Sequence, residues 1–326
     1  MPEMGMNSSR RRALKTITAI GILPLSGGFS FVASTSPAIA ANHTKATQSL
    51  PRVGLALGSG GARGLSHLLI FEVLEQLSIR PHRISGCSIG AIMGALYASG
   101  LSAKEIRREL EKLIAARDES WFESLLSGDW RQWLGFLQRS QRQGGLIESD
   151  AFVAYLHKIS GVSKFTELDI PLQIVATDYW QRSMVVFDSG QLWPAVQASM
   201  AMPSLFSPVE HQGKILVDGG LTNPVPFDLL LDDCDIVIAV NVLGTHRQDD
   251  DIAHQNPTYL ENIFNTFQIM QYSILQEKIK REEPDYLVSP EIRDIKVLDF
   301  HRMHDILKQA QPQADQLKDK LSKRLG

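Results

Sequence analysis

Apolar residues in this chain form short continuous runs that alternate with longer stretches in which they recur every three or four positions. The short runs predict buried strands at 53–57, 83–87, 172–177, 184–188, 215–218 and 236–242. The longer stretches predict helices at 65–77, 89–99, 103–117 and 259–281, and another helix that ends near the C-terminus. Because strands and helices alternate and the strand runs are apolar, we expect a mainly parallel sheet covered by helices.

The composition is that of a folded globular protein. With 44% hydrophobic and 21% charged residues, the chain of 326 residues can bury a sizeable core, which excludes a disordered or fibrous protein. No linker rich in Pro, Ser or Gly interrupts the chain after residue 50, so one large α/β domain is favoured over two small ones.

The first 40 residues differ from the rest of the chain. The sequence SRRRALK at 9–15 precedes a mildly apolar stretch at 17–32, and AIA follows at 38–40. This pattern is typical of a twin-arginine signal peptide, and the apolar stretch is too short and too weakly apolar for a transmembrane helix. We therefore expect residues 1–40 to be cleaved after Ala40 and the protein to be exported to the periplasm or beyond. A disordered tail with a chance arginine cluster is the alternative.

Charge and cysteine content limit the partners. The first 40 residues carry +3 of a total formal charge of −3, which leaves −6 on the other 286 residues. An acidic protein has no general attraction for nucleic acid or for an anionic bilayer, so we expect no nucleic-acid partner and only local, apolar contact with lipid. The two cysteines, Cys87 and Cys234, lie beside apolar segments and indicate no disulfide framework.

The residues Gly86-Cys87-Ser88-Ile89-Gly90 form a G-x-S-x-G motif between a predicted strand and a predicted helix, which is the context that this motif requires. Glycines two positions before and after Ser88 remove Cβ atoms where strand and helix converge. The helix N-terminus also directs partial positive charge toward the serine hydroxyl. Ser88 is therefore the candidate nucleophile. Gly and Ser are common, so the assignment needs a base and an oxyanion site as well.

A glycine-rich loop, GSGGARG at 58–64, lies between the preceding strand and helix. Acyl transfer places negative charge on the substrate oxygen, and backbone N–H groups of such a loop can approach it closely. The candidate oxyanion residues are Gly58, Ser59, Gly60, Gly61, Arg63 and Gly64, with Gly60 and Gly61 favoured as donors. Arg63 could fix the loop by bonding to backbone carbonyls, or it could hold an acidic head group. A dinucleotide fingerprint is the competing interpretation, but the sixth position of G-x-G-x-x-G falls on Arg63.

A nucleophilic serine needs a base, and Asp218 is the candidate. It ends the predicted strand 215–218 and is followed by Gly219-Gly220, so its carboxylate should emerge at a strand end. Direct proton transfer from a hydroxyl to a carboxylate needs a dry setting that raises the basicity of the carboxylate. Two alternatives stay open. Asp218 could be a turn residue before glycine, or a histidine such as His246 could complete a Ser-His-Asp triad.

Taken together, these segments resemble the patatin-like phospholipase family, in its bacterial branch similar to neuropathy target esterase. GSGGARG matches the family's oxyanion loop, GCSIG at 86–90 its nucleophile elbow and DGG at 218–220 its aspartate motif, in the same order. The segment 195–203, with Phe206 and Pro208, resembles the family's stretch ahead of the aspartate. The resemblance covers residues 52–245.

The resemblance implies a three-layer α/β/α fold. From the extent of the resemblance we expect a linker at 41–51, a catalytic core at 52–245 and a helical and strand extension at 246–326 packed on the core. It implies a dyad in which Ser88 attacks the acyl carbonyl of a lipid, Asp218 takes the proton and the loop holds the oxyanion. Phospholipids, lysophospholipids or related lipid esters are the implied substrates, with no cofactor and no metal. A catalytically silent lipid-binding protein and acyl transfer to an acceptor other than water stay open.

Aromatic and aliphatic residues are concentrated at 121–137, which holds three of the five tryptophans. An amphipathic, aromatic-rich lid would draw an enzyme onto a lipid surface, so this segment is a candidate for membrane-surface contact. A helix packed on the core is the alternative. The acidic run at 249–251 could suggest a calcium site, but a solvated loop is the favoured interpretation.

Overall fold

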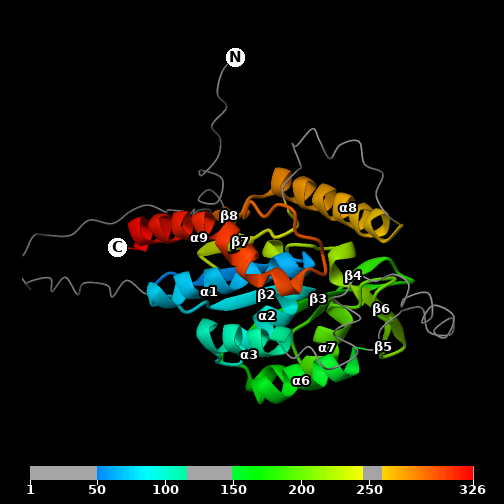
Figure 1. Cartoon of the computed structure of the whole chain (residues 1–326). Helices are drawn as coiled ribbons and strands as arrows, with labels where there is room; N and C mark the ends of the chain where they lie inside the picture. The colour runs from blue at the N-terminus through cyan, green and yellow to red at the C-terminus, as the bar shows by residue number, and fades with distance from the viewer. Residues whose placement is uncertain (1–49, 116–148, 245–258, 326) are drawn as a thin grey trace, which may run out of the picture. The chain divides into compact units, whose positions relative to one another are not determined.

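Figure 1 shows the computed structural model of the chain, in which residues 50–115, 149–244 and 259–325 are described. The predicted signal peptide at 1–40, the tryptophan-rich segment at 121–137 and the acidic run at 249–251 lie outside these residues. So does His246. The predictions made for them, and the predicted domain boundaries, stay predictions.

An eight-stranded sheet crosses the described part of the chain in the order β5-β6-β3-β2-β1-β7-β8, with β4 also paired to β3. Parallel pairs join β1 (Val53–Leu57), β2 (Arg83–Cys87), β3 (Leu172–Asp178), β7 (Ile236–Val240) and β8 (Tyr286–Val288). Antiparallel pairs add β4 (Ser183–Phe187), β5 (Val209–His211) and β6 (Lys214–Asp218). The mainly parallel sheet is therefore confirmed, and its antiparallel side is a feature that the sequence did not reveal.

Successive residues of the central strands point to opposite faces of this sheet and contribute to a larger and a smaller core, and a third small cluster of described residues joins Ala176, Ala198 and Leu216. Leu55 and Leu57 of β1 belong to the larger core, whereas Ala56 belongs to a smaller one. The larger core includes residues of the helices α1 (His67–Gln76), α2 (Ile89–Ala98), α3 (Ala103–Ala115), α6 (Asp150–Ser160), α7 (Leu192–Ser199) and α9 (Met303–Leu325). The smaller core includes residues of the 3-10 helix Phe227–Leu230 and of α8 (Tyr259–Arg281). The three-layer α/β/α architecture is thus confirmed (Figure 1).

The glycine loop changes where the first helix begins. The sequence predicted a helix at 65–77, but α1 begins at His67 because the loop continues as the 3-10 helix Gly61–Ser66. Helix α9 packs against this 3-10 helix and against α1. Residues near the C-terminus therefore support the loop that the sequence assigned to the oxyanion site.

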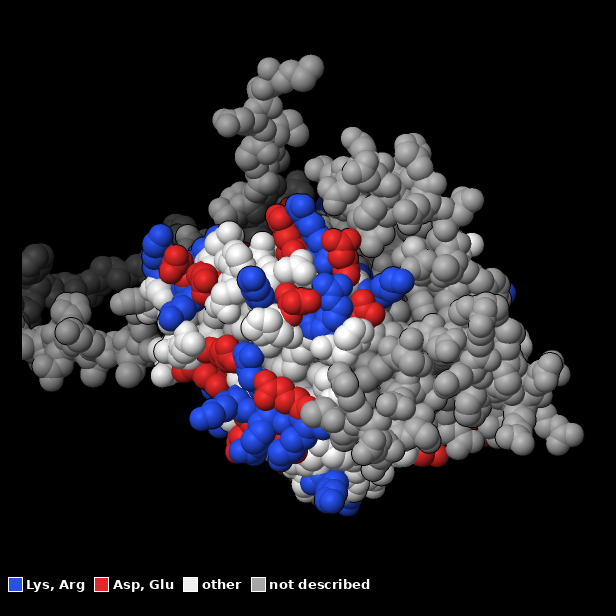
Figure 2. All heavy atoms as spheres, viewed as in Figure 1, with Lys and Arg blue, Asp and Glu red and all other residues white. Residues whose placement is uncertain are grey.

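Charged side chains of both signs are interspersed on the face that carries α1, α3 and α9 (Figure 2). Arg107 of α3 and Glu72 of α1, for example, form an ion pair with an N–O distance of 2.5 Å. Within the described ranges, no helix combines the length and the hydropathy that a bilayer crossing requires.

Candidate active site

Ser88 forms the turn between β2, which ends at Cys87, and α2, which begins at Ile89. Its backbone φ is 54° and its ψ is −121°, a conformation that residues with a side chain rarely adopt and that stores strain at functional sites. Glycine makes the turn possible, because a Cβ atom on Gly90 would lie 2.1 Å from the carbonyl oxygen of Leu57. The G-x-S-x-G segment therefore folds as a tight elbow with Ser88 at its apex.

Strand β6 brings Asp218 to the level of Ser88 from the opposite direction. Both β2 and β6 pair with β3, where Cys87 lies opposite Val175 and Asp218 lies opposite Ala176. The residue after Cys87 is thus level with Asp218 across β3. The sequence argument placed Asp218 at a strand end of a parallel sheet, and this reason was wrong because β6 runs antiparallel to β3. The register of the two pairings, not a shared strand direction, aligns the two residues.

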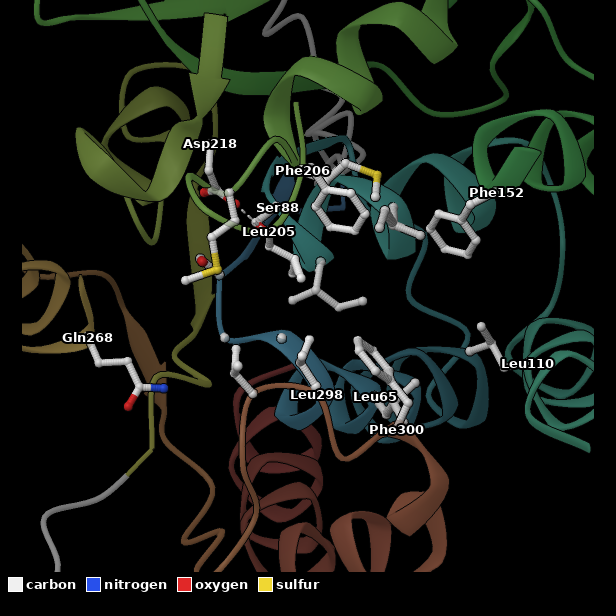
Figure 3. A pocket seen from close by; sticks show the side chains of 18 of the residues that line it. Leu65, Ser88, Leu110, Phe152, Leu205, Phe206, Asp218, Gln268, Leu298 and Phe300 are labelled. Atoms are coloured by element: carbon white, nitrogen blue, oxygen red, sulfur yellow. Dashed lines mark hydrogen bonds between the residues drawn. The ribbon is translucent and has the colours of Figure 1, made fainter. Parts of the chain in front are cut away.

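The Ser88 hydroxyl donates a hydrogen bond to Asp218, with an Oγ–Oδ2 distance of 2.6 Å (Figure 3). The other carboxylate oxygen accepts from the N–H of Gly220 at 2.7 Å. The residue is 4% exposed. Burial raises the pKa of Asp218 to about 6, since loss of water disfavours the charged form more than the hydrogen bonds from Ser88 and Gly220 favour it. The carboxylate therefore has the raised basicity that direct proton transfer from a serine requires.

No histidine of the described ranges hydrogen-bonds to Ser88 or Asp218. His67 is fully buried, and its Nε2 is 3.0 Å from the carbonyl oxygen of Gly58. Burial lowers the pKa of His67 to about 4, so its ring is neutral at physiological pH. The sequence argument did not identify His67. It supports the glycine loop through its contact with the carbonyl oxygen of Gly58.

The glycine loop lines a cavity in front of Ser88, but its N–H groups have different partners. Gly58 donates to the carbonyl of Val240 at 3.0 Å and Ser59 to that of Pro224 at 2.8 Å. Both residues were predicted to belong to the oxyanion site. Their N–H groups cannot serve as oxyanion donors, because they bind these two carbonyls and hold the loop in place. Among the described residues, no acceptor pairs with the N–H of Gly60 or Gly61. These two remain the candidate donors.

Arg63 and Gly64 fix the loop against the rest of the protein. The Arg63 guanidinium donates through Nε to the carbonyl of Val242 at 3.2 Å and through Nη1 to that of Ile295 at 3.0 Å. Only 8% of Arg63 is exposed, so of its two expected roles the structure supports the one toward backbone carbonyls. A Cβ atom on Gly64 would lie 2.3 Å from a methyl carbon of Ile89, so the glycine lets the loop pack directly on the start of α2.

Ser199, the last residue of α7, supports the elbow and was missed by the sequence argument. Its hydroxyl accepts a hydrogen bond from the N–H of Ser88 at 2.9 Å and donates to the carbonyl of Val175 at 2.6 Å. The residue is fully buried. Ser199 thus ties the strained elbow to β3, the strand that also aligns Asp218. Its only signal in the sequence was its place in the segment 195–203.

An apolar cavity extends from the Ser88 hydroxyl, and its two sides differ in polarity (Figure 3). Leu110, Phe152 and Phe300 lie on one side of Ser88, and Gln268 of α8 lies on the other. Asp218 is the one ionisable side chain that the described residues contribute to the lining. The cavity therefore suits an uncharged alkyl chain whose polar end lies at Ser88.

Comparisons with known proteins agree with one another on the family that this chain resembles. The family model of patatin-like phospholipases matches residues 55–231, more than half of the chain. An uncharacterised NTE family protein of Mycobacterium bovis is 32% identical over 223 residues, which are 68% of this chain and 57% of that protein. Lysophospholipase NTE1 of Candida glabrata is 27% identical over 78% of this chain and 15% of its own length. Patatin-like phospholipase domain-containing protein 6 of Homo sapiens is 30% identical over 61% of this chain and 14% of its own length.

Proposed function

Because this chain belongs to the patatin-like phospholipase family, a family of lipid hydrolases, we propose that it cleaves acyl esters of lipids through a Ser88–Asp218 dyad. The proposal covers activity of the phospholipase A, lysophospholipase or esterase type. Its main support is the 2.6 Å hydrogen bond from the Ser88 hydroxyl to a buried carboxylate of raised pKa, at one end of an apolar cavity. The aligned part spans only about half of the mycobacterial relative, so the substrate is proposed from the site itself.

In the proposed reaction, the Ser88 oxygen attacks the acyl carbonyl carbon while Asp218 accepts the hydroxyl proton. The N–H groups of Gly60 and Gly61 stabilise the oxyanion of the tetrahedral intermediate, and one such donor contributes about 3 kcal/mol. The intermediate collapses, and the leaving alcohol takes the proton from Asp218. Water then attacks the acyl-enzyme with Asp218 again as the base, which releases the fatty acid and restores Ser88.

Labelling with a lipid-like phosphonate probe tests the nucleophile directly. We expect the full chain to be modified at Ser88, as mapped by mass spectrometry of its peptides, and the Ser88→Ala variant to stay unlabelled. Modification at any other residue would overturn the assignment. A short-chain ester assay with the same variant separates a hydrolase from a silent lipid-binding protein, because a binding protein shows no release that depends on Ser88.

A Ser-His-Asp triad is the rival within hydrolases, and histidine substitutions decide between the two. We expect each single histidine replacement to leave turnover measurable, because the structure places no described histidine at the dyad. Loss of turnover in one such variant, together with an active and folded Asp218→Asn variant, would show that the base is a histidine.

We also propose that residues 1–40 direct export and that the segment 121–137 contacts lipid surfaces. Support for both comes from the sequence patterns alone. Replacing Arg10 and Arg11 by lysine should retain the protein in the cytoplasm, measured by cell fractionation. Replacing Trp130 and Trp133 by alanine should weaken liposome binding and activity on micellar substrate. Unchanged values in both assays would remove the lipid-contact proposal.

A further inference from the structure

We propose that Leu110 of α3 and Phe152 of α6 close the far end of the cavity beside Ser88 and thereby limit the length of the acyl chain that the enzyme accepts. Figure 3 shows both side chains at the end of the cavity opposite Asp218 and Gln268. The inference rests on the proposed function, since it needs an acyl chain whose carbonyl carbon lies at Ser88. It extends that function by proposing that Leu110 and Phe152 determine which lengths of acyl chain are accepted.

The sequence of α3 directs an apolar side toward the cavity. Ile106, Leu110, Leu113 and Ile114 recur at intervals of three and four residues, which places them on one face of the helix. Ile106 is fully buried and Leu110 is 7% exposed. The last three of these residues line the cavity. Helix α3 thus forms a continuous apolar wall in which Leu110 belongs to the buried part.

Helix α6 is held against this wall near Phe152. The hydroxyl of Tyr155 donates to the carbonyl oxygen of Glu109 at 3.4 Å, which joins α6 to α3 at the residue before Leu110. Phe152 lies one helical turn before Tyr155, so it is close to this contact. The side-chain amide of Gln197 in α7 donates to the Ser149 hydroxyl at 3.1 Å and so fixes the start of α6. Phe152 therefore lies on a part of α6 that is held by hydrogen bonds on either side of it, at Ser149 and at Tyr155.

The polarity of the cavity decides which way an acyl chain lies. On the side of Gln268, the wall also includes the amide of Gln271 and the hydroxyl of Ser59, which are 3.4 Å apart. On the opposite side, the described lining around Leu110 and Phe152 is apolar. Alkyl groups gain free energy by leaving water for an apolar wall, whereas an ester head group needs hydrogen-bond partners. The chain therefore extends toward Leu110 and Phe152, and these side chains meet its methyl end.

A series of straight-chain 4-nitrophenyl esters with 4 to 16 carbons, hydrolysed by the full chain, tests this inference. Each kcat/KM is divided by the value of the four-carbon ester for the same variant, so that the comparison concerns chain length alone. We expect Phe152→Ala to move the optimum to longer chains by about two to four carbon atoms, because methylene groups fill the space of the lost ring. For the longest esters, the normalised kcat/KM should rise about tenfold. Leu110→Phe should move the optimum to shorter chains.

Two controls keep the test decisive. Val153→Ala removes a buried side chain of the same helix that does not line the cavity, and its chain-length profile should match that of the unmodified protein. Calorimetric titration with saturated fatty acids of 8 to 18 carbons measures the same length limit without turnover. If Phe152→Ala does not fold, Phe152→Leu takes its place in both measurements. Unchanged profiles in both measurements would overturn the inference. Loss of all serine-dependent hydrolysis with a shifted fatty-acid profile would instead count against the proposed function alone.

Discussion

The parallel and antiparallel strands of this sheet are buried to different degrees. Every residue of β1 and β7 is buried, since helices or turns cover both faces of these strands. In β4, by contrast, Ser183 and Met184 are exposed and the other three residues are only partly buried. The central parallel strands therefore carry most of the core, whereas β4 and β5 are lightly covered. Strand β6 lies between these extremes, because its last three residues are buried.

Each part supplies one member of the proposed dyad. Ser88 follows the parallel strand β2, and Asp218 ends the antiparallel strand β6, with β3 paired to both. Strands of opposite direction can end at the same level, so a carboxylate from β6 reaches the elbow after β2 although β3 lies between the two strands. The comparison shows that stability and chemistry have different sources here. The core depends on the parallel strands, and the active site depends on the register across β3.

The largest effect is expected where the two parts meet. Ser88→Ala and Asp218→Asn should each lower kcat on a short-chain ester by at least about 10³-fold, and the double variant should lose no more than either single one, because the two residues act as a unit. Asp188→Asn, which changes an exposed carboxylate just after β4, should leave kcat within about twofold. Additive losses in the double variant would contradict a dyad.

Truncations in the two parts should differ in their effect on stability. Leu55→Ala in the fully buried strand β1 should lower the free energy of unfolding by about 2 to 5 kcal/mol. Met184→Ala in β4, where the side chain is 39% exposed, should lower it by about 1 kcal/mol or less. Urea unfolding followed by circular dichroism measures both. Equal losses would show that the antiparallel part contributes to the core as strongly as the parallel part.

Asp218 should destabilise the fold at neutral pH. Its folded pKa of about 6 lies above the ordinary value of 3.8, so the folded state holds the proton more tightly and loses stability as pH rises from about 4 through 6. Two pKa units correspond to about 3 kcal/mol. Asp218→Asn should therefore raise the free energy of unfolding at pH 7 by about 1 to 3 kcal/mol, and the gain should shrink below pH 4. A gain that is independent of pH would point to another cause.

Ser199 should act on catalysis through the elbow. We expect Ser199→Ala to lower kcat about 10- to 100-fold with little change in KM and to slow phosphonate labelling, because the N–H of Ser88 loses its acceptor. Ser199→Thr keeps a hydroxyl and should restore part of the rate. If the alanine variant is less stable but retains full kcat, Ser199 has a structural role only.

The pH dependence of the unmodified protein tests Asp218 as the base without any substitution. Asp218 must be ionised to accept a proton, so kcat/KM on an uncharged ester should fall about tenfold per pH unit below the pKa of about 6. Above that value the rate should level off. Steady-state assays between pH 4.5 and 8 measure the profile, and full activity at pH 5 would contradict Asp218 as the base.

Local sequence patterns predicted the strands β1, β2, β3, β4, β6 and β7, the helices α1, α2, α3, α8 and α9, and the elbow at Ser88, but they did not predict α6 or α7. Such patterns suffice because a buried strand needs an apolar run and a tight strand-to-helix turn needs glycine at fixed positions. The same reasoning could not separate Gly58 and Ser59 from Gly60 and Gly61. Their N–H partners, Val240 and Pro224, lie more than 160 residues further along the chain.

The sequence alone thus determined the individual pieces of this protein: the elbow, the glycine loop, the aspartate before two glycines and the α/β alternation. These follow from short-range sterics and from the spacing of apolar residues. Only the tertiary structure decided that Ser88 and Asp218 are level across β3, that Ser199 and His67 support the site, and that α3 and α6 close the cavity. Such contacts join residues far apart in the chain, and packing and strand register, which no local pattern encodes, select them.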